Sequence, residues 1–287
     1  MLRLPPAPVE GTAHRLIASA LVLSVAASIG SFSVAAPTYS VARGLAYQKA
    51  QDWQGLLRYA TAWSQAQPNS IDAWAFIGSA YEVGFKQPEK AIVPLRRCVA
   101  IDPSSAPAWH ALGTAYTMTK EWASAVDAFK RAIQLNPNQP TYYNNLAAAY
   151  SGGNAVKSAM AALDREKVLA ERLNRATVWY TLGNGYAQLT DLNNAIAAYR
   201  RLLTIEPGFA QGWTNLGVVL QYSGDTAGAR SAYRRGVQLG DPLAGKDEAQ
   251  MEADLRAQAQ QQIQQQNNIG PARAGMRGTS KVKCWAR

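Results

Sequence analysis

Few residues of this chain belong to the types that carry out catalysis or hold metals. Its 287 residues include two histidines and two cysteines, namely His14, His110, Cys98 and Cys284. None of the four has a neighbour at the spacing by which zinc sites are recognised. The sequence also lacks a glycine loop with a following lysine for phosphate and a Gly-x-Ser-x-Gly elbow for acyl transfer. We therefore expect no metal, no cofactor and no enzyme activity.

The regular spacing of apolar residues indicates which elements would position a functional side chain. Large apolar residues recur at helical intervals and predict two helices joined by a polar turn around Lys120. The clearest copy of this pattern consists of Trp109, Leu112, Gly113, Tyr116, Ala125, Phe129, Ala132 and Pro137. Pro137 is expected to end the second helix, because proline lacks an N–H and disfavours helix in the preceding residue. Gly113 and Ala125 are small, so we expect the two backbones to come closest there.

The same pattern returns at a period of roughly 34 residues. Two strong copies are Trp179, Leu182, Gly183, Tyr186, Ala195, Tyr199, Pro207 and Trp213, Leu216, Gly217, Ala229, Tyr233. Three weaker copies are Trp74, Ile77, Gly78, Tyr81, Ala91, Leu95, Pro103; Tyr143, Leu146, Ala147, Tyr150, Ala159, Leu163; and Gly44, Tyr47, Leu56, Ala60, Trp63, Pro68. The copy at Trp74 has one extra residue in its turn, and the copy at Tyr143 lacks the closing proline.

This pattern resembles the tetratricopeptide repeat over residues 37–242. The resemblance implies an all-α fold, a right-handed superhelical solenoid of about six helix-turn-helix repeats. One hairpin is too small to bury its own apolar face, so neighbouring hairpins are expected to stack and share a continuous core. Cys98 corresponds to Ala132 and is expected to be a small buried residue between helices.

The first 36 residues are typical of an export segment. A basic start precedes a run of apolar and small residues from Leu16 to Ile29, and further small residues follow. A signal peptide that is cleaved after Ala35 accounts for this layout. A retained anchor is the alternative, because residues 16–36 are about as long as the roughly 20 that a membrane helix needs. In both cases we expect an exported protein, periplasmic or secreted, or one anchored by residues 16–36.

The two segments after the repeats differ in composition. Residues 243–269 are rich in Ala and Gln and are expected to form a helix that caps the last hairpin, since terminal repeats need a polar cover to stay soluble. Residues 270–287 are rich in Gly, Arg and Lys, and we expect them to be a basic disordered tail. The narrow apolar edge of the capping helix would consist of Met251, Leu255, Ala259 and Ile263.

The chain carries a formal net charge of +10, and part of the excess is ordered on the repeats. Basic residues occupy the same two sites of four second helices: Arg96, Arg97, Lys130, Arg131, Arg200, Arg201, Arg234 and Arg235. Stacked repeats would present them as a basic outer stripe, interrupted at Asp164. This stripe favours either docking to an anionic membrane or envelope polymer or an ordinary solvated helix surface. Since no nucleic-acid motif accompanies it, we expect no nucleic-acid partner.

The resemblance also implies a binding groove, which the first helix of every repeat lines in this family. The implied groove residues are Phe76, His110, Thr114, Met118, Asn144, Asn145, Tyr180, Asn184, Gln188, Asn215 and Tyr222. They include none of the basic residues with which some family members clamp a C-terminal carboxylate. Asn145 and Asn215 resemble the asparagine ladder of the repeat domain of O-linked N-acetylglucosamine transferase, where amides hold an extended peptide backbone. Alternatively these asparagines are ordinary polar groove residues, and His110 is a packing residue.

We therefore expect a non-catalytic scaffold that binds a protein or an extended peptide in its groove, within a cell-envelope assembly. One alternative is a structural subunit whose groove is filled by its own C-terminal helix or by a neighbouring copy. Another is an accessory of an envelope polysaccharide synthesis or secretion machine. A repeat fold by itself does not distinguish these possibilities, because such folds are reused for many functions.

Overall fold

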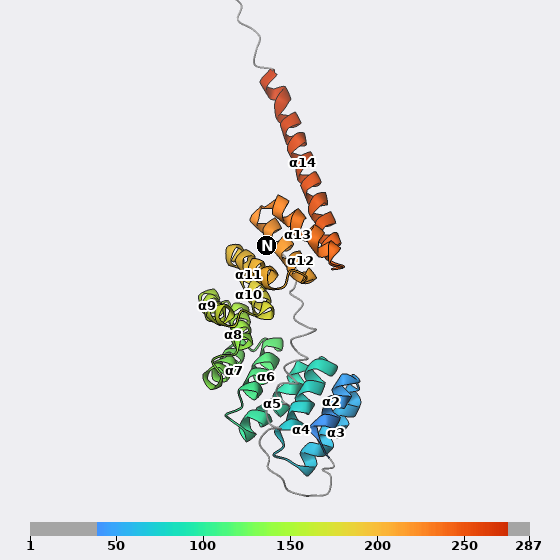
Figure 1. The fold of residues 1–287 in the computed structure, drawn as a ribbon, viewed down its shortest axis with the longest axis vertical. Helices are drawn as coiled ribbons and strands as arrows, with labels where there is room; N and C mark the ends of the chain where they lie inside the picture. Colours follow the sequence, from blue (N-terminus) through green and yellow to red (C-terminus); the bar gives the residue numbers. More distant parts are fainter. Residues whose placement is uncertain (1–38, 275–287) are drawn as a thin grey trace, which may run out of the picture. The chain divides into compact units, whose positions relative to one another are not determined.

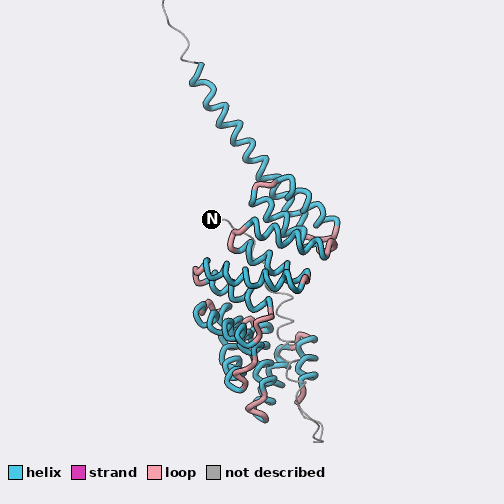
Figure 2. Tube along the Cα trace, turned by 60° about the vertical axis from the view of Figure 1, so that its left-hand side comes forward, coloured by secondary structure: helices cyan, strands magenta, loops and turns pink. Residues whose placement is uncertain are grey.

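The structure is a computed structural model that describes residues 39–274. Within this span it contains α-helices and one π-helical turn, and it contains no strand (Figures 1 and 2). The expected all-α fold is therefore confirmed. The predictions for residues 1–36 and for most of the tail 270–287 concern positions outside the described residues.

The described chain divides into two compact units, one ending at Ile205 and one beginning at Glu206. The first unit contains five helical hairpins: α2 (Val41–Lys49) with α3 (Trp53–Ala66), α4 (Ile71–Ser79) and the π-turn η1 (Ala80–Gly84) with α5 (Pro88–Ile101), α6 (Ala106–Met118) with α7 (Trp122–Leu135), α8 (Pro140–Gly152) with α9 (Val156–Leu173), and α10 (Ala176–Gln188) with α11 (Leu192–Ile205). The second unit contains α12 (Ala210–Ser223), α13 (Thr226–Gln238) and α14 (Ala244–Ala274). We call the first and second helix of each hairpin its A helix and B helix.

Close contact within the hairpins depends on glycine in the A helix. A Cβ atom added at Gly113 would lie 2.7 Å from the ring of Phe129, and one added at Gly217 would lie 2.6 Å from the ring of Tyr233. Both distances are far below van der Waals contact, so a side chain at either glycine would push the B helix away. The predicted close approach at Gly113 is confirmed. Cys98 is fully buried on α5, as expected from its correspondence to Ala132.

A closing proline, where it is present, holds the start of the A helix that follows it. The carbonyl oxygen of Pro103 accepts a hydrogen bond of 2.9 Å from the indole Nε1 of Trp109. The same bond is made by Trp74 to Pro68 at 2.9 Å and by Trp213 to Pro207 at 2.8 Å. In the fourth repeat Tyr143 replaces tryptophan, and its hydroxyl donates to Pro137 at 3.0 Å. The proline thus ends one helix and holds the start of the following A helix.

The fourth hairpin lacks the closing proline, and its B helix is longer than the others. α9 has 18 residues, whereas α7 and α11 have 14. It ends at Leu173 and is followed by Asn174, whose φ of 48° is left-handed, a conformation that asparagine tolerates. Without a proline carbonyl at the usual place, the buried Nε1 of Trp179 has no hydrogen-bond partner. The missing proline therefore changes the helix length and leaves one donor unsatisfied.

The extra residue of the second repeat is accommodated differently from our expectation. We expected it in the turn, but the end of the A helix widens instead into the π-turn Ala80–Gly84. A π-turn absorbs one residue without breaking the helical path. The hairpin itself forms as predicted, and only the place of the extra residue differs from our expectation.

The capping helix is longer than predicted and caps with only part of its length. α14 continues to Ala274, beyond residue 269 at which we expected the capping helix to end. Met251 is only 2% exposed, whereas Ile263 is 57% exposed. The helix runs on past the end of α13, as Figure 1 shows. The predicted apolar edge is thus covered at Met251 but open to solvent at Ile263.

Candidate functional site

Phe76 and His110 do not line an accessible groove, which corrects two predictions. Phe76 is fully buried on α4, with its ring 6.2 Å from that of Trp63. His110 is buried on α6, where its ring stacks on Tyr142 at 4.7 Å and packs against Phe129 at 5.5 Å. Both side chains face the core because aromatic rings at these positions fill the space between neighbouring hairpins.

Two polar side chains form hydrogen bonds with His110. Asn145 Nδ2 lies 2.8 Å from His110 Nε2, so the ring accepts this bond when its proton is on Nδ1. Thr114 is also buried, and its hydroxyl donates to the carbonyl of His110 at 3.1 Å. Thr114 is therefore a third predicted groove residue that the structure places in the core. Asn145 is half-buried, and this contact uses one of its two amide donors.

Asn144 participates in a buried polar cluster that the sequence analysis missed. Its Nδ2 donates to Glu166 Oε2 at 3.0 Å and to the carbonyl of Thr181 at 3.1 Å. The Thr181 hydroxyl donates to Glu166 Oε1 at 2.8 Å, so the cluster joins α8, α9 and α10. Both amide donors of Asn144 are used inside the protein, which leaves none for a peptide backbone.

Glu166 is fully buried, and burial raises the pKa of its carboxyl group to about 8. The hydrogen bonds from Asn144 and Thr181 lower this pKa but do not offset the desolvation. The sequence contained a signal for this residue: the equivalent positions of other repeats hold Cys98, Ala132 and Leu202. An acid among small and apolar residues at a core position indicates a buried carboxyl group.

The remaining predicted residues of the first unit lie on three A helices, α6, α8 and α10. α8 contacts both of the other two. Met118 is 39% exposed, Gln188 is exposed, and the other three are half-buried. We call this set the A-helix surface; its members are Met118, Asn145, Tyr180, Asn184 and Gln188. None carries a charge. Asn184 is fixed by the hydroxyl of Tyr199, which donates to its Oδ1 at 2.6 Å.

The second unit contributes two of the predicted groove residues. Asn215 and Tyr222 are half-buried on α12. The nearby Gln221 accepts a hydrogen bond of 2.8 Å from the Tyr233 hydroxyl, which corresponds to the bond from Tyr199 to Asn184. In both units a B-helix tyrosine thus orients an amide of the A helix.

The predicted basic stripe separates into two kinds of residue. In two pairs of the first unit, the first residue contacts the following helix: Arg96 Nε donates to the Tyr116 hydroxyl at 2.7 Å, and Lys130 Nζ lies 5.8 Å from the ring centre of Tyr150. Asp164, which interrupts the stripe, accepts from the Tyr186 hydroxyl at 3.3 Å. These residues act between repeats, so the stripe is not a single solvated row.

The second residue of each pair lies at the surface. Arg97, Arg131, Arg201 and Arg235 are exposed. Arg131 and Arg235 donate to the exposed Gln134 and Gln238 of their own helices, each at 3.1 Å. Arg201 also donates to Asn174 Oδ1, at the end of α9, at 3.0 Å. Arg97, Arg131 and Arg235 are therefore better placed than Arg201 to meet an external anion without breaking a contact between helices.

Two further features of the described residues concern metal binding and membranes. No group of three or more His, Cys, Asp or Glu side chains among residues 39–274 is arranged to hold a metal ion. In the same part of the chain, every helix is too short or too polar to cross a membrane.

The class of this protein follows from its fold. The fold consists of helical hairpins whose two helices approach closely at a glycine and whose second helix commonly ends at a proline. Sequence profiles described as tetratricopeptide repeat match residues 106–139 and 176–209, which are the hairpins α6–α7 and α10–α11. The chain is 35% identical over 86 residues to a TPR repeat-containing protein of Pseudomonas aeruginosa, a match that covers 29% of this chain and 82% of that protein. The chain belongs to the tetratricopeptide repeat family.

Other relatives are matched over a smaller part of their length. The chain is 27% identical over 167 residues to the PEX5-related protein of Homo sapiens, which covers 53% of this chain and 26% of that protein. It is 23% identical over 141 residues to the protein O-mannosyl-transferase TMTC1 of Mus musculus, 49% of this chain and 12% of that protein. The chain thus spans about a quarter or less of these two relatives.

A solved structure supports the fold. PilF of Pseudomonas aeruginosa superposes with a TM-score of 0.50 at 22% identity, over 68% of this chain and 89% of that one. Proteins with this fold are in general non-catalytic scaffolds, and the chain is a protein-interaction scaffold of tetratricopeptide repeats.

Proposed function

We propose that the protein binds an extended peptide segment of a partner protein along the A-helix surface. The observation that carries this proposal is the chemistry of that surface: it is partly exposed and uncharged over three consecutive A helices, with amide side chains on α8 and α10. A carboxamide donates to a backbone C=O and accepts from an N–H, so it holds a chain without reading its side chains.

Met118 supports the proposal with a different kind of contact. It occupies the position of Gln188 two repeats later, and its unbranched thioether adapts to varied apolar side chains. An exposed methionine beside half-buried amides fits a peptide that presents backbone to the amides and an apolar side chain to α6. The loss of Phe76, His110, Thr114 and Asn144 from the predicted groove confines this surface to fewer residues than we expected.

The proposal is tested by comparing the partners captured by two matched variants. Met118→Glu places a charge on the A-helix surface, and Val93→Glu makes the same kind of change at an exposed residue of the B helix α5. Tagged full-length wild type and both variants are incubated with extract of the source cells, and bound proteins are identified by mass spectrometry. We expect a set of proteins that Met118→Glu loses and Val93→Glu keeps. Equal capture by all three chains would contradict the proposal.

We further propose that the protein acts without catalysis and within a cell-envelope assembly. The first part is supported by the scaffold fold, and the second by the basic and then apolar layout of residues 1–36. Intact mass of the native protein in soluble and membrane fractions tests the location. A chain that begins near Ala36 indicates a diffusible exported adaptor, and a full-length chain in the membrane fraction indicates an anchored subunit. Full-length protein confined to the cytosol would contradict the envelope proposal.

A further inference from the structure

The last hairpin differs from the others on the side where the next repeat would stack. In the four preceding B helices, the residue after the small alanine is apolar: Ile92, Val126, Met160 and Ile196. In α13 the same position holds Arg230. Arg234 lies one turn later, at the position where Arg96 and Lys130 contact a tyrosine of the following helix. At Arg230 the end surface of the second unit is therefore charged where the internal stacking surfaces are apolar, whereas Arg234 is at a position that is basic in other repeats as well.

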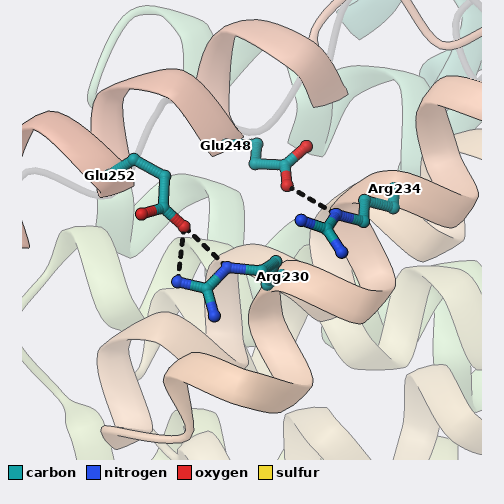
Figure 3. Close-up of polar contacts among 4 residues, drawn as sticks. All are labelled: Arg230, Arg234, Glu248 and Glu252. Atoms are coloured by element: carbon teal, nitrogen blue, oxygen red, sulfur yellow. Dashed lines mark hydrogen bonds and ion pairs between the residues drawn. The ribbon is translucent and has the colours of Figure 1, made fainter.

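α14 covers this end surface with acids that match the arginines (Figure 3). Arg230 Nε and Nη2 both lie 2.6 Å from Glu252 Oε1, and Arg234 Nε lies 3.1 Å from Glu248 Oε1. Met251 is buried beside them. Residues three and four apart share one face of a helix, so Glu248, Met251 and Glu252 form a single docking face. This face consists of two acids one turn apart with an apolar residue next to the second.

The cover that α14 provides is incomplete. An open cavity of about 720 Å³ lies beside the two ion pairs, and it is lined by Arg230, Arg234, Glu248, Glu252 and Arg256 among others. Val237 is 47% exposed, whereas Val99 and Leu203, in the same position of other B helices, are 8% and 6% exposed. An apolar stacking position thus stays open beside the arginines.

The ion pairs that hold α14 against α13 contribute little stability. Both ion pairs are partly exposed, and exposed pairs stabilise little and are screened by salt. Permanent interfaces bury apolar surface, as the internal stacking positions do. A charged interface to which α14 contributes Ala244 and Met251 as its buried apolar residues is instead suited to exchange.

We propose that the α13 end surface is a second interaction surface, which takes an acidic amphipathic helix of a partner protein in place of α14. The partner helix would present two acidic residues one turn apart to Arg230 and Arg234, and an apolar residue where Met251 lies. It would also reach Val237, which α14 leaves exposed. α14 and the partner helix then compete for the same surface of α13. Because a tethered segment has an effective concentration in the millimolar range, the partner must make such additional contacts to displace it.

The test uses the full-length chain and a fluorescent peptide of residues 244–262 as the probe for an acidic helix. In Glu248→Arg/Glu252→Arg, repulsion from Arg230 and Arg234 releases α14 and leaves the end surface open. We expect fluorescence anisotropy to show at least tenfold tighter binding of the peptide to this variant than to wild type, and we expect the binding to weaken with added salt. Glu248→Gln/Glu252→Gln, which removes the pairs without new repulsion, should show the same change to a smaller extent.

A charge-swapped chain provides the matched control. Adding Arg230→Glu and Arg234→Glu to the double arginine variant restores both pairs with reversed sign, so the peptide should no longer bind. No peptide binding by either released variant, with circular dichroism showing the hairpins folded, would overturn the proposal. Equal binding by the swapped chain would also overturn it. A dimer of the wild type in sedimentation equilibrium that Glu248→Arg/Glu252→Arg abolishes would make a second copy the occupant, and would likewise exclude a different partner protein.

Discussion

At the scale of single residues, Glu166 shows how the environment changes a side chain. Its carboxyl group is fully buried between α8, α9 and α10, and its pKa is raised to about 8. Burial also raises the pKa of Glu82 to about 7 and that of Asp72 to about 6. A raised pKa means that the folded state holds the proton more tightly than the unfolded chain does. Folding then takes up protons at neutral pH, so the free energy of unfolding falls as pH rises.

The variant Glu166→Gln should reduce this pH dependence. In wild type the contribution of Glu166 is lost between about pH 4.5, the unfolded pKa, and about pH 8, the folded pKa. The neutral amide accepts from Asn144 and donates to the Thr181 hydroxyl, so it keeps the cluster without titrating. We expect urea titrations at pH 5 and pH 8.5 to differ less for the variant than for wild type, by an amount on the order of 3 kcal/mol.

The residual slope from Asp72 and Glu82 serves as an internal reference, because the substitution leaves both in place. An unchanged difference between the two pH values would show that Glu166 is already ionised in the folded protein at neutral pH. Lower stability of the variant at every pH would instead show that the amide does not replace the carboxyl group.

At the scale of elements, the closing prolines and the interior glycines decide how helices pair. Trp109 and Trp179 are equivalent residues of two repeats, but only Trp109 finds a proline carbonyl. Gly113 and Gly208 are both glycines, but only Gly113 is in close contact with a neighbouring side chain. Within each pair the residue type is the same and only its contacts differ. The same substitution at both members therefore measures what the contact contributes to stability.

Trp109→Phe should destabilise the protein more than Trp179→Phe. Both changes remove an indole, but only the first removes a hydrogen bond, which contributes about 0.5–1.5 kcal/mol. The second removes a buried donor that has no partner, which itself costs free energy in the folded state. Denaturant unfolding of the two variants measures the difference. Equal losses would show that Trp179 Nε1 is hydrogen-bonded in solution.

Gly113→Ala should lower the free energy of unfolding by about 1–3 kcal/mol. The new Cβ would lie 2.7 Å from the ring of Phe129 in a well-packed interior, so α6 and α7 must separate. Gly208→Ala is the matched control, since no atom lies within 4 Å of the added Cβ. Chemical denaturation of both variants checks the prediction. A Gly113→Ala variant as stable as the control would mean that the hairpin relaxes without cost.

At the scale of the whole molecule, each hairpin of the first unit packs chiefly on its sequence neighbours within that unit, so stability varies along the chain. Elements with few tertiary contacts open locally at low free-energy cost. In the described part of the chain, α14 is the extreme case: residues 256–265 are all exposed, while the hairpin α6–α7 contains many fully buried residues.

Hydrogen exchange should follow this gradient. We expect backbone amides of residues 256–265 to exchange fastest among the helices, residues 244–255 to be intermediate, and α6 and α7 to be slowest. Exchange of the full-length protein followed by mass spectrometry provides the measurement. Protection of residues 256–265 equal to that of α6 would contradict the picture of an uncovered helix, and dilution would then show whether a second copy covers it.

Much of this architecture followed from local sequence pattern. Helical spacing of large residues, glycines such as Gly113 and prolines such as Pro103 act on their immediate neighbours, so the helices and their pairing were predictable. The extra residue near Tyr81 is an exception. Its presence could be predicted, but it could be absorbed either in a turn or in a helix, and the backbone adopted the π-turn.

The site depended on more distant contacts. The repeat, its family and the uncharged character of the predicted groove residues could be read from the sequence, because these depend on spacing and residue type. Which of those residues face solvent became clear from the three-dimensional structure alone. It buried Phe76 and His110, used both donors of Asn144 on Glu166 and Thr181, and set Arg230 against Glu252. The physical reason is that burial and hydrogen bonding depend on neighbours tens of residues away, whereas a repeat pattern records only the spacing within one hairpin.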